Sequence, residues 1–186
     1  MKKILIFIFV FSAQEVYSQV EFDTAAIKAQ LKMIFIRDQK TRIEKDSVGY
    51  MKFIDSTNLC QLEPLLERYG WMGRSVVGDT ANSAIFLVIQ HSNLETQLKY
   101  LPLLQKSVEN GDSRPSNLAL MQDRILMRQG KKQIYGSQVI TNASGGYEFY
   151  PIEDEANVNM RRAKIGMSPL EDYAKFFGIE YQLPEK

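Results

Sequence analysis

Apolar residues recur every three or four positions along most of the chain, which is the spacing of a helix with one buried face. The first such segment covers residues 23–45, and its apolar stripe consists of Ile27, Leu31, Ile34 and Phe35. Asp38 and Arg42 continue the stripe, four residues apart with the acid first, an order that favours an ion pair. The pair has two interpretations: an exposed pair where the helix leaves the core, or a fixed carboxylate and guanidinium that line a cleft.

The same spacing, together with capping residues, predicts further helices. A second helix covers residues 58–69, with Pro64 near its first turn and Gly70 at its end. A third helix is capped by Ser92 or Asn93 and runs through Val108, with a kink at Pro102. Two more cover Pro115 to Gly130 and residues 154–166. The last starts at a Ser168–Glu171 capping box and ends at Gly178.

Residues 79–91 contain the apolar run IFLVI, which fits either a buried helix or a central strand. The Ala and Asn content favours the helix, and a strand over residues 85–89 is the alternative. On the helical interpretation His91 lies at the C-terminal end, where the helix dipole favours an imidazolium. His91 is then a capping or core residue, or else a catalyst.

Two short β-segments follow the helix that ends at Gly130. Residues 134–141 and 147–152 are separated by NASGG, which predicts a β-hairpin near residues 134–152. An isolated hairpin is marginally stable in water, so we expect it to pack on the helices. The predicted fold is therefore mainly α, a single helical domain over residues 19–186 with one small hairpin.

The composition is that of an ordinary globular domain, with 186 residues of which 45% are hydrophobic and 24% charged. The net charge is +1 with both signs interspersed, which argues against nucleic acid as a partner. Cys60 is the only cysteine, so no intrachain disulfide is possible, and we expect an inert, partly buried thiol. With one histidine and no cysteine cluster, we expect no metal site and no cofactor.

Residues 1–18 have the layout of a bacterial secretory signal peptide. A Lys-Lys start precedes an apolar run over residues 4–11 that is too short to span a membrane. Cleavage after Ser18 fits best, and cleavage after Ala13 is the second choice. We therefore expect an exported protein, periplasmic or secreted, without a membrane span.

Asp123 is the least expected polar residue in this pattern. Its helical neighbours are all apolar, namely Ala119, Leu120, Leu126 and Met127. Such a carboxylate needs a partner, because unpaired burial is costly or forces protonation. Downstream, Gly136 permits a close approach to the backbone, and Gln138 is either an edge hydrogen-bonder or a ligand contact. Trp71, in a glycine-rich loop, is either a core anchor or a stacking platform for a ligand.

Five short motifs together resemble a family of uncharacterised bacterial proteins, a domain of unknown function. They are DQKTR at 38–42, YGWMGRSVVG at 69–78, QH at 90–91, DR at 123–124 and QIYGSQ at 133–138. In that family a Pro usually follows the Trp and a Thr usually stands at the position of Ser137, whereas here Met72 replaces the Pro. The resemblance implies that the motif set comprises Asp38, Gln39, Arg42, Trp71, Gln90, His91, Asp123, Arg124, Gln133, Tyr135 and Gln138. It implies no activity.

The first functional hypothesis is an exported binding module. Its pocket would be lined by Asp38, Arg42, His91, Asp123 and Gln138, with Trp71 or Tyr135 as a wall. Arg42 would hold a carboxylate and Gln138 an amide, which indicates a small peptide-like or cell-wall-derived ligand.

Two alternatives remain open. A hydrolase or transferase would use His91 as general base and Asp123 as its orienter or as an acid, which requires the two side chains to meet directly or through one water. In the second alternative, the polar residues form an internal hydrogen-bond network that fixes the helix packing and binds no ligand.

Overall fold

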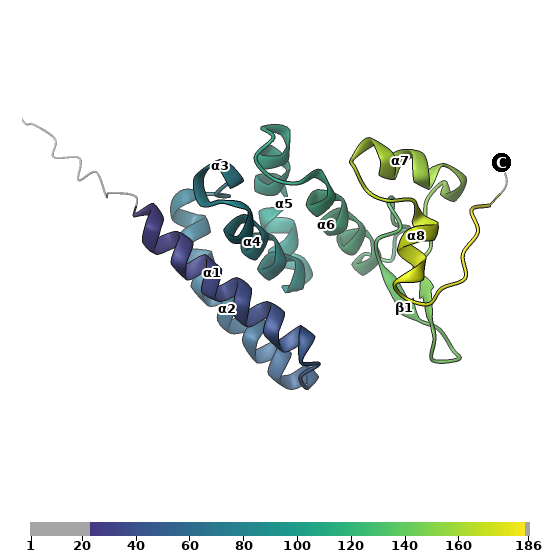
Figure 1. Cartoon of the computed structure of the whole chain (residues 1–186), viewed down its shortest axis with the longest axis horizontal. Coiled ribbons are helices and arrows are strands. Elements are labelled where there is room, and N and C mark those ends of the chain that lie inside the picture. The colour runs from purple at the N-terminus through teal and green to yellow at the C-terminus, as the bar shows by residue number, and fades with distance from the viewer. Residues whose placement is uncertain (1–22, 185–186) are drawn as a thin grey trace, which may run out of the picture.

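The structure is a computed structural model that describes residues 23–184, so the predicted signal peptide and both of its cleavage sites lie outside the described residues. Within this range the chain is mainly α, as predicted, with eight α-helices and one two-stranded hairpin (Figure 1). The elements are α1 (Thr24–Ile43), α2 (Val48–Tyr69), α3 (Arg74–Val77), α4 (Asp79–His91), α5 (Leu94–Glu109), α6 (Pro115–Arg128), β1 (Val139–Thr141), β2 (Tyr147–Phe149), α7 (Val158–Lys164) and α8 (Leu170–Lys175).

The main core lies between α1, α2, α4, α5 and α6, and α4 is at its centre. The α4 helix packs against each of the other four, which explains why its sequence is apolar on more than one face. Ile85 and Ile89 are completely buried there, together with Leu31 of α1 and Leu62 of α2. The helix predicted for residues 79–91 is thus confirmed, and the alternative strand is wrong.

The α2 helix begins ten residues earlier than predicted. Ser47 caps it by accepting a hydrogen bond from the Tyr50 N–H, and the helix runs to Tyr69 before Gly70 stops it at a positive φ of 67°. Its first turns expose Val48 and Phe53, so no clear apolar stripe marks them in the sequence. Pro64 consequently lies inside the helix, and the prediction that it lies near the first turn is wrong.

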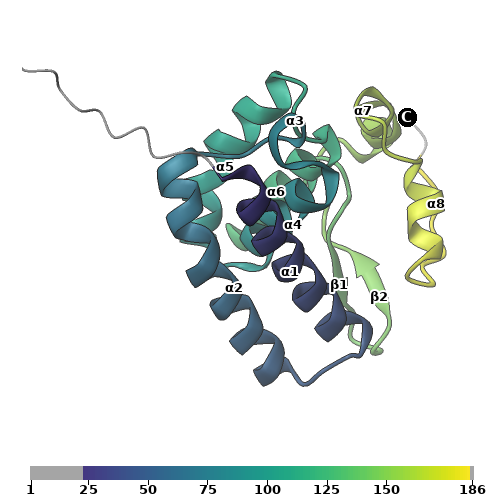
Figure 2. The same cartoon turned by 60° about the vertical axis from the view of Figure 1, so that its left-hand side comes forward.

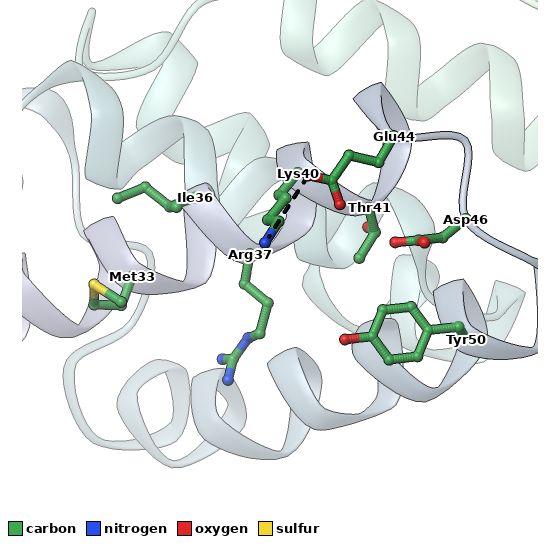
Figure 3. A pocket seen from close by; sticks show the side chains of 8 residues that line it. All are labelled: Met33, Ile36, Arg37, Lys40, Thr41, Glu44, Asp46 and Tyr50. Carbon is green, nitrogen blue, oxygen red and sulfur yellow. Dashed lines mark ion pairs between the residues drawn. The ribbon is translucent and has the colours of Figure 1, made fainter.

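The antiparallel pair of α1 and α2 extends past the rest of the helical core (Figure 2). A groove of 460 Å³ lies between them near this end. Figure 3 shows Met33, Ile36 and Lys40 of α1 on one side of the groove and Tyr50 of α2 on the other. None of the residues predicted to form the functional site lines it.

The C-terminal part has its own small core. Ile152, Val158 and Leu170 are buried in it, and β1 pairs antiparallel with β2 in the register Val139↔Phe149. The hairpin is confirmed, although its strands are shorter than the predicted segments. Gly136, at a φ of +67°, lies so close to the Leu170 and Ile152 side chains that a Cβ there would meet them at 2.9 and 3.0 Å.

Three smaller predictions need correction. Cys60 is exposed and not partly buried, because α2 turns that face to solvent. The loop that contains Trp71 includes the short helix α3. Helix α8 begins at Leu170 without a side-chain cap, and its first N–H donates to Asn159 instead of a Ser168 capping box. Among the described helices, none combines the length and the hydropathy that a membrane span requires.

Candidate functional site

Four charged or titratable side chains from three helices meet at one end of the helical core. Asp38 and Arg42 come from the last turns of α1, Asp55 from α2 and His91 from the last residue of α4. Asp38 and Arg42 face inward because they continue the apolar stripe of α1. The terminal guanidinium nitrogen Nη2 of Arg42 lies 3.1 Å from Asp38 Oδ1 and 2.5 Å from both Asp55 Oδ1 and His91 Nδ1. We call these four residues the Asp38 cluster.

Asp38 is the anchor of this cluster, with only 1% of its surface exposed. Burial raises the pKa of its carboxyl, but the hydrogen bond and charge interaction with His91, the positive charge of Arg42 and the amide of Gln39 outweigh burial and lower that pKa below its ordinary value of 3.8. Gln39 Nε2 donates to Oδ2 at 2.8 Å, so Oδ1 is left for the other members. The carboxylate is therefore ionised at neutral pH and fixed in orientation.

The position of protons in the cluster follows from counting donors. Arg42 Nη2 carries two hydrogens, and the two carboxylates of Asp38 and Asp55 accept them. His91 Nδ1 lies 2.9 Å from Asp38 Oδ1, so the favourable tautomer carries its proton on Nδ1 and donates it to Asp38. The other ring nitrogen, Nε2, makes no hydrogen bond within residues 23–184 and is available to a ligand.

A hollow of 220 Å³ adjoins the cluster on the side of His91 and Asp55. It is lined by residues of α2, the end of α4 and the following turn, and all but Leu59 are of polar or charged types: Lys52, Asp55, Ser56, Leu59, His91, Ser92 and Asn93. The exposed Lys52 adds a positive charge at the rim. His91 thus contacts a buried carboxylate through Nδ1, and its side chain, 17% exposed, also lines the hollow.

Asp123 has different surroundings. It is fully buried on α6, and its two oxygens accept hydrogen bonds from the backbone N–H groups of Ile134, Tyr135 and Ser137 at 2.7, 3.1 and 3.0 Å. Arg162, itself buried, donates to the carbonyl of Tyr135 at 2.7 Å. Asp123 therefore holds the segment before β1 against α6, and its polar contacts within the described residues do not include His91.

Two glutamines, Gln133 and Gln138, lie beside Asp123 and Arg162, and we call these four residues the Asp123 cluster. The buried Gln133 donates to the carbonyls of Gln138 and Tyr150 and accepts from the Gln138 N–H. Gln138 Oε1 in turn accepts from Arg124 Nε at 3.0 Å. These amides bind the protein's own backbone and side chains, so the predicted pairing of Gln138 with a ligand amide has no free group to make it.

Arg124 and Gln90 connect the two clusters. Arg124 donates to the carbonyl of Gln90, the residue before His91, at 3.4 Å. Burial lowers the pKa of Arg124, and the positive charges of Arg128 and Arg42 add to this effect. The polar residues thus come from distant parts of the chain to one region, as expected, but they divide into a charged group at a hollow and a backbone-binding group behind it.

The two predicted aromatic walls lie elsewhere. Trp71 packs against the main core and donates from Nε1 to Ser113 Oγ at 3.2 Å, beside a different hollow. Tyr135 takes part through its backbone, between Asp123 and Arg162. Neither residue lines the hollow at His91, so the core role of Trp71 is the one the structure supports.

Asp55 is the site residue that the sequence interpretation missed. The structure starts α2 at Val48, which places Asp55 three residues before Asn58, on the same side of the helix. Asn58 is buried and accepts a hydrogen bond from Arg37 of α1, so this side of α2 faces α1. Ligand atoms of Asp38, Asp55 and His91 all lie within 4.8 Å of one another, a grouping that is able to hold a metal ion. The expectation of no metal site rested on the cysteine and histidine counts and did not consider this carboxylate pair.

Comparison with known proteins returns no matching curated protein and no matching solved structure. The family described as "Family of unknown function (DUF6624)" matches over residues 13–186, which includes every residue of both clusters. This agrees with the resemblance seen in the five motifs, and the chain belongs to that family.

Proposed function

We propose that this protein is an exported binding module that holds one polar group of a small peptide-like or cell-wall-derived ligand in the hollow at His91. The observation that carries the proposal is that His91 is held through Nδ1 by a buried carboxylate and also lines a hollow. Export rests on the layout of residues 1–18.

The size and charge of the hollow indicate which part of a ligand it takes. At 220 Å³ it is smaller than the roughly 300 Å³ or more of a site that encloses a whole small molecule, so it fits a terminal group. Lys52 supplies a cation, and Ser56 and Asn93 supply neutral hydrogen-bonding groups. Arg42 is already engaged by two carboxylates, so Lys52 replaces it as the partner for a ligand carboxylate.

The test is a calorimetric and thermal-shift titration of the untagged mature protein with D-alanyl-D-alanine and N-acetylmuramyl dipeptide, in the presence of a chelator. Each probe is compared with a form whose terminal carboxylate is amidated. We expect binding of the free acid, at least tenfold weaker binding in Lys52→Gln and His91→Gln, and no change in the control Lys28→Gln on the exposed face of α1. Equal affinities in all variants, or no binding of either probe, would overturn the proposal.

A hydrolase or transferase is the second candidate, and the 2.9 Å contact between His91 Nδ1 and Asp38 Oδ1 favours it. A carboxylate that holds the Nδ1–H leaves Nε2 as a general base toward a substrate or a water in the hollow. In this arrangement Asp38 is the orienter, in place of Asp123. Product release from the same probes, lost in His91→Gln while binding persists, would distinguish catalysis from binding alone.

A further inference from the structure

The contacts of the Asp38 cluster cannot all be favourable at once. Three acceptor atoms, Asp38 Oδ1, Asp55 Oδ1 and His91 Nδ1, surround Arg42 Nη2, which has only two hydrogens. If Nδ1 carries a proton for Asp38, its 2.5 Å contact with Nη2 joins two donors. If Nδ1 is unprotonated, its 2.9 Å contact with Asp38 joins two acceptors. A cation without hydrogens would satisfy all three atoms at the same time.

The charges of the cluster lead to the same conclusion. Two carboxylates with a neutral imidazole carry two negative charges, and one guanidinium neutralises only one of them. Arg42 Nε is buried without a hydrogen-bond partner among the described residues, so the arginine is itself incompletely satisfied. With about a quarter of its side chain exposed, Arg42 has a route to solvent.

From these contacts we propose that Asp38, Asp55 and His91 form a binding site for a divalent transition cation of the zinc class, and that this cation takes the position of Arg42 Nη2. One imidazole nitrogen and two carboxylate oxygens are donors that Zn²⁺ accepts, and three protein ligands leave a fourth position open. This inference goes beyond the proposed function and does not depend on it.

The geometry needs only small changes. Tetrahedral bonds of about 2.0–2.1 Å place zinc ligands roughly 3.3 Å apart. His91 Nδ1 and Asp38 Oδ1 are already 2.9 Å apart, and all the ligand atoms lie within 4.8 Å. Asp55 is 23% exposed, so its carboxylate is not locked in a fully buried position. Gln39 already holds the second oxygen of Asp38, as outer-shell groups do at metal sites. Two of the three ligands, Asp55 and His91, also line the hollow, so the site adjoins it.

The experiment is a Zn²⁺ titration of the untagged mature protein in competition with a chromophoric chelator. We expect one Zn²⁺ per chain, at least tenfold weaker binding in Asp55→Asn, and unchanged binding in Asp172→Asn, an exposed acid of α8 whose only ion pair within the described residues is with Lys175. Arg42→Gln should bind Zn²⁺ at least tenfold more tightly, because the competing cation is removed. A purely structural salt bridge predicts no such gain.

A second readout requires no substitution. His91 is the only histidine, so its ring gives the only imidazole signals in a ¹⁵N NMR spectrum. Zn²⁺ at Nδ1 should move the ring proton to Nε2 and shift the Nδ1 resonance. The proposal is overturned if saturating Zn²⁺ leaves the ring unchanged, if Asp55→Asn binds as well as Asp172→Asn, or if Arg42→Gln binds no more tightly than the wild type.

Discussion

Asp38 and Asp123 are both buried carboxylates, yet they have opposite kinds of partners. The three backbone N–H groups that Asp123 binds belong to one segment, and none of them titrates. Asp38 binds an imidazole, a guanidinium and an amide from side chains, next to a hollow. Burial of a charge therefore does not identify a functional site by itself. The partners of the buried charge decide whether its role is structural or functional. Backbone amides fix a loop, whereas titratable side chains are able to bind a ligand and exchange protons with it.

The largest expected effect on stability tests the structural role of Asp123. Asp123→Asn places an NH₂ donor against backbone N–H donors in a fully buried position. We expect the free energy of unfolding to fall by about 3 kcal/mol, since a buried donor left without an acceptor costs about 1–3 kcal/mol. Urea denaturation measures this loss. A variant as stable as the wild type would contradict the loop-holding role of Asp123.

The next effect tests the packing of the segment that Asp123 holds. In Gly136→Ala the new Cβ would lie about 3 Å from Leu170 and Ile152 at a positive φ, so both overpacking and backbone strain oppose it. We expect a loss of about 2 kcal/mol in thermal or urea unfolding. Gly49→Ala is the matched control, because nothing lies within 4 Å of its Cβ position, and it should be neutral or slightly stabilising.

The pH dependence of the free energy of unfolding should differ between the wild type and a variant without the Asp38 charge. The folded-state pKa of Asp38 is lowered below 3.8, so its ionised form stabilises the fold above that pH, and this contribution is lost as the pH falls through the folded-state pKa. Asp38→Asn should therefore cost about 1–3 kcal/mol at neutral pH, and this difference from the wild type should shrink toward zero in acid. A difference that stays constant from neutral pH into acid would be the contrary result. Urea unfolding at a series of pH values measures it.

The smallest stability effect is expected at Asp55, which is partly exposed at the rim of the hollow. Its ion pair with Arg42 should contribute no more than about 1 kcal/mol, as for other partly solvated pairs. Asp55→Asn should thus leave the fold nearly as stable while ligand or metal binding falls. A loss as large as that of Asp123→Asn would erase the distinction between the two clusters.

The sequence predicts the helices and the hairpin because their periodicity and their stops are local. Ile27, Leu31 and Ile34 mark the buried face of α1, and Gly70 and Gly130 terminate their helices at positive φ. The start of α2 is missed because its first turns are exposed, and with it Asp55. The pairing of Asp38 with His91 is suggested only by shared apolar faces.

The division into two clusters could not be predicted from the sequence, because it depends on which residues form hydrogen bonds with each polar side chain in the folded chain. In the sequence, Gln138 looks equally suited to a ligand and to a loop. The structure shows its amide engaged by Arg124 and Ser137. Long-range contacts of this kind arise from tertiary packing and have no local signal in the chain.

The central claim is that His91 is oriented by Asp38 and not by Asp123, and its single imidazole allows a direct measurement. Long-range ¹H–¹⁵N NMR of the metal-free protein, recorded with a chelator at about pH 8, above the ordinary histidine pKa, reports which ring nitrogen carries the proton. We predict a proton on Nδ1 in the wild type and in folded Asp123→Asn, with a change of tautomer in Asp38→Asn. A proton on Nε2 in the wild type, or a tautomer that responds to Asp123→Asn and not to Asp38→Asn, would contradict this account.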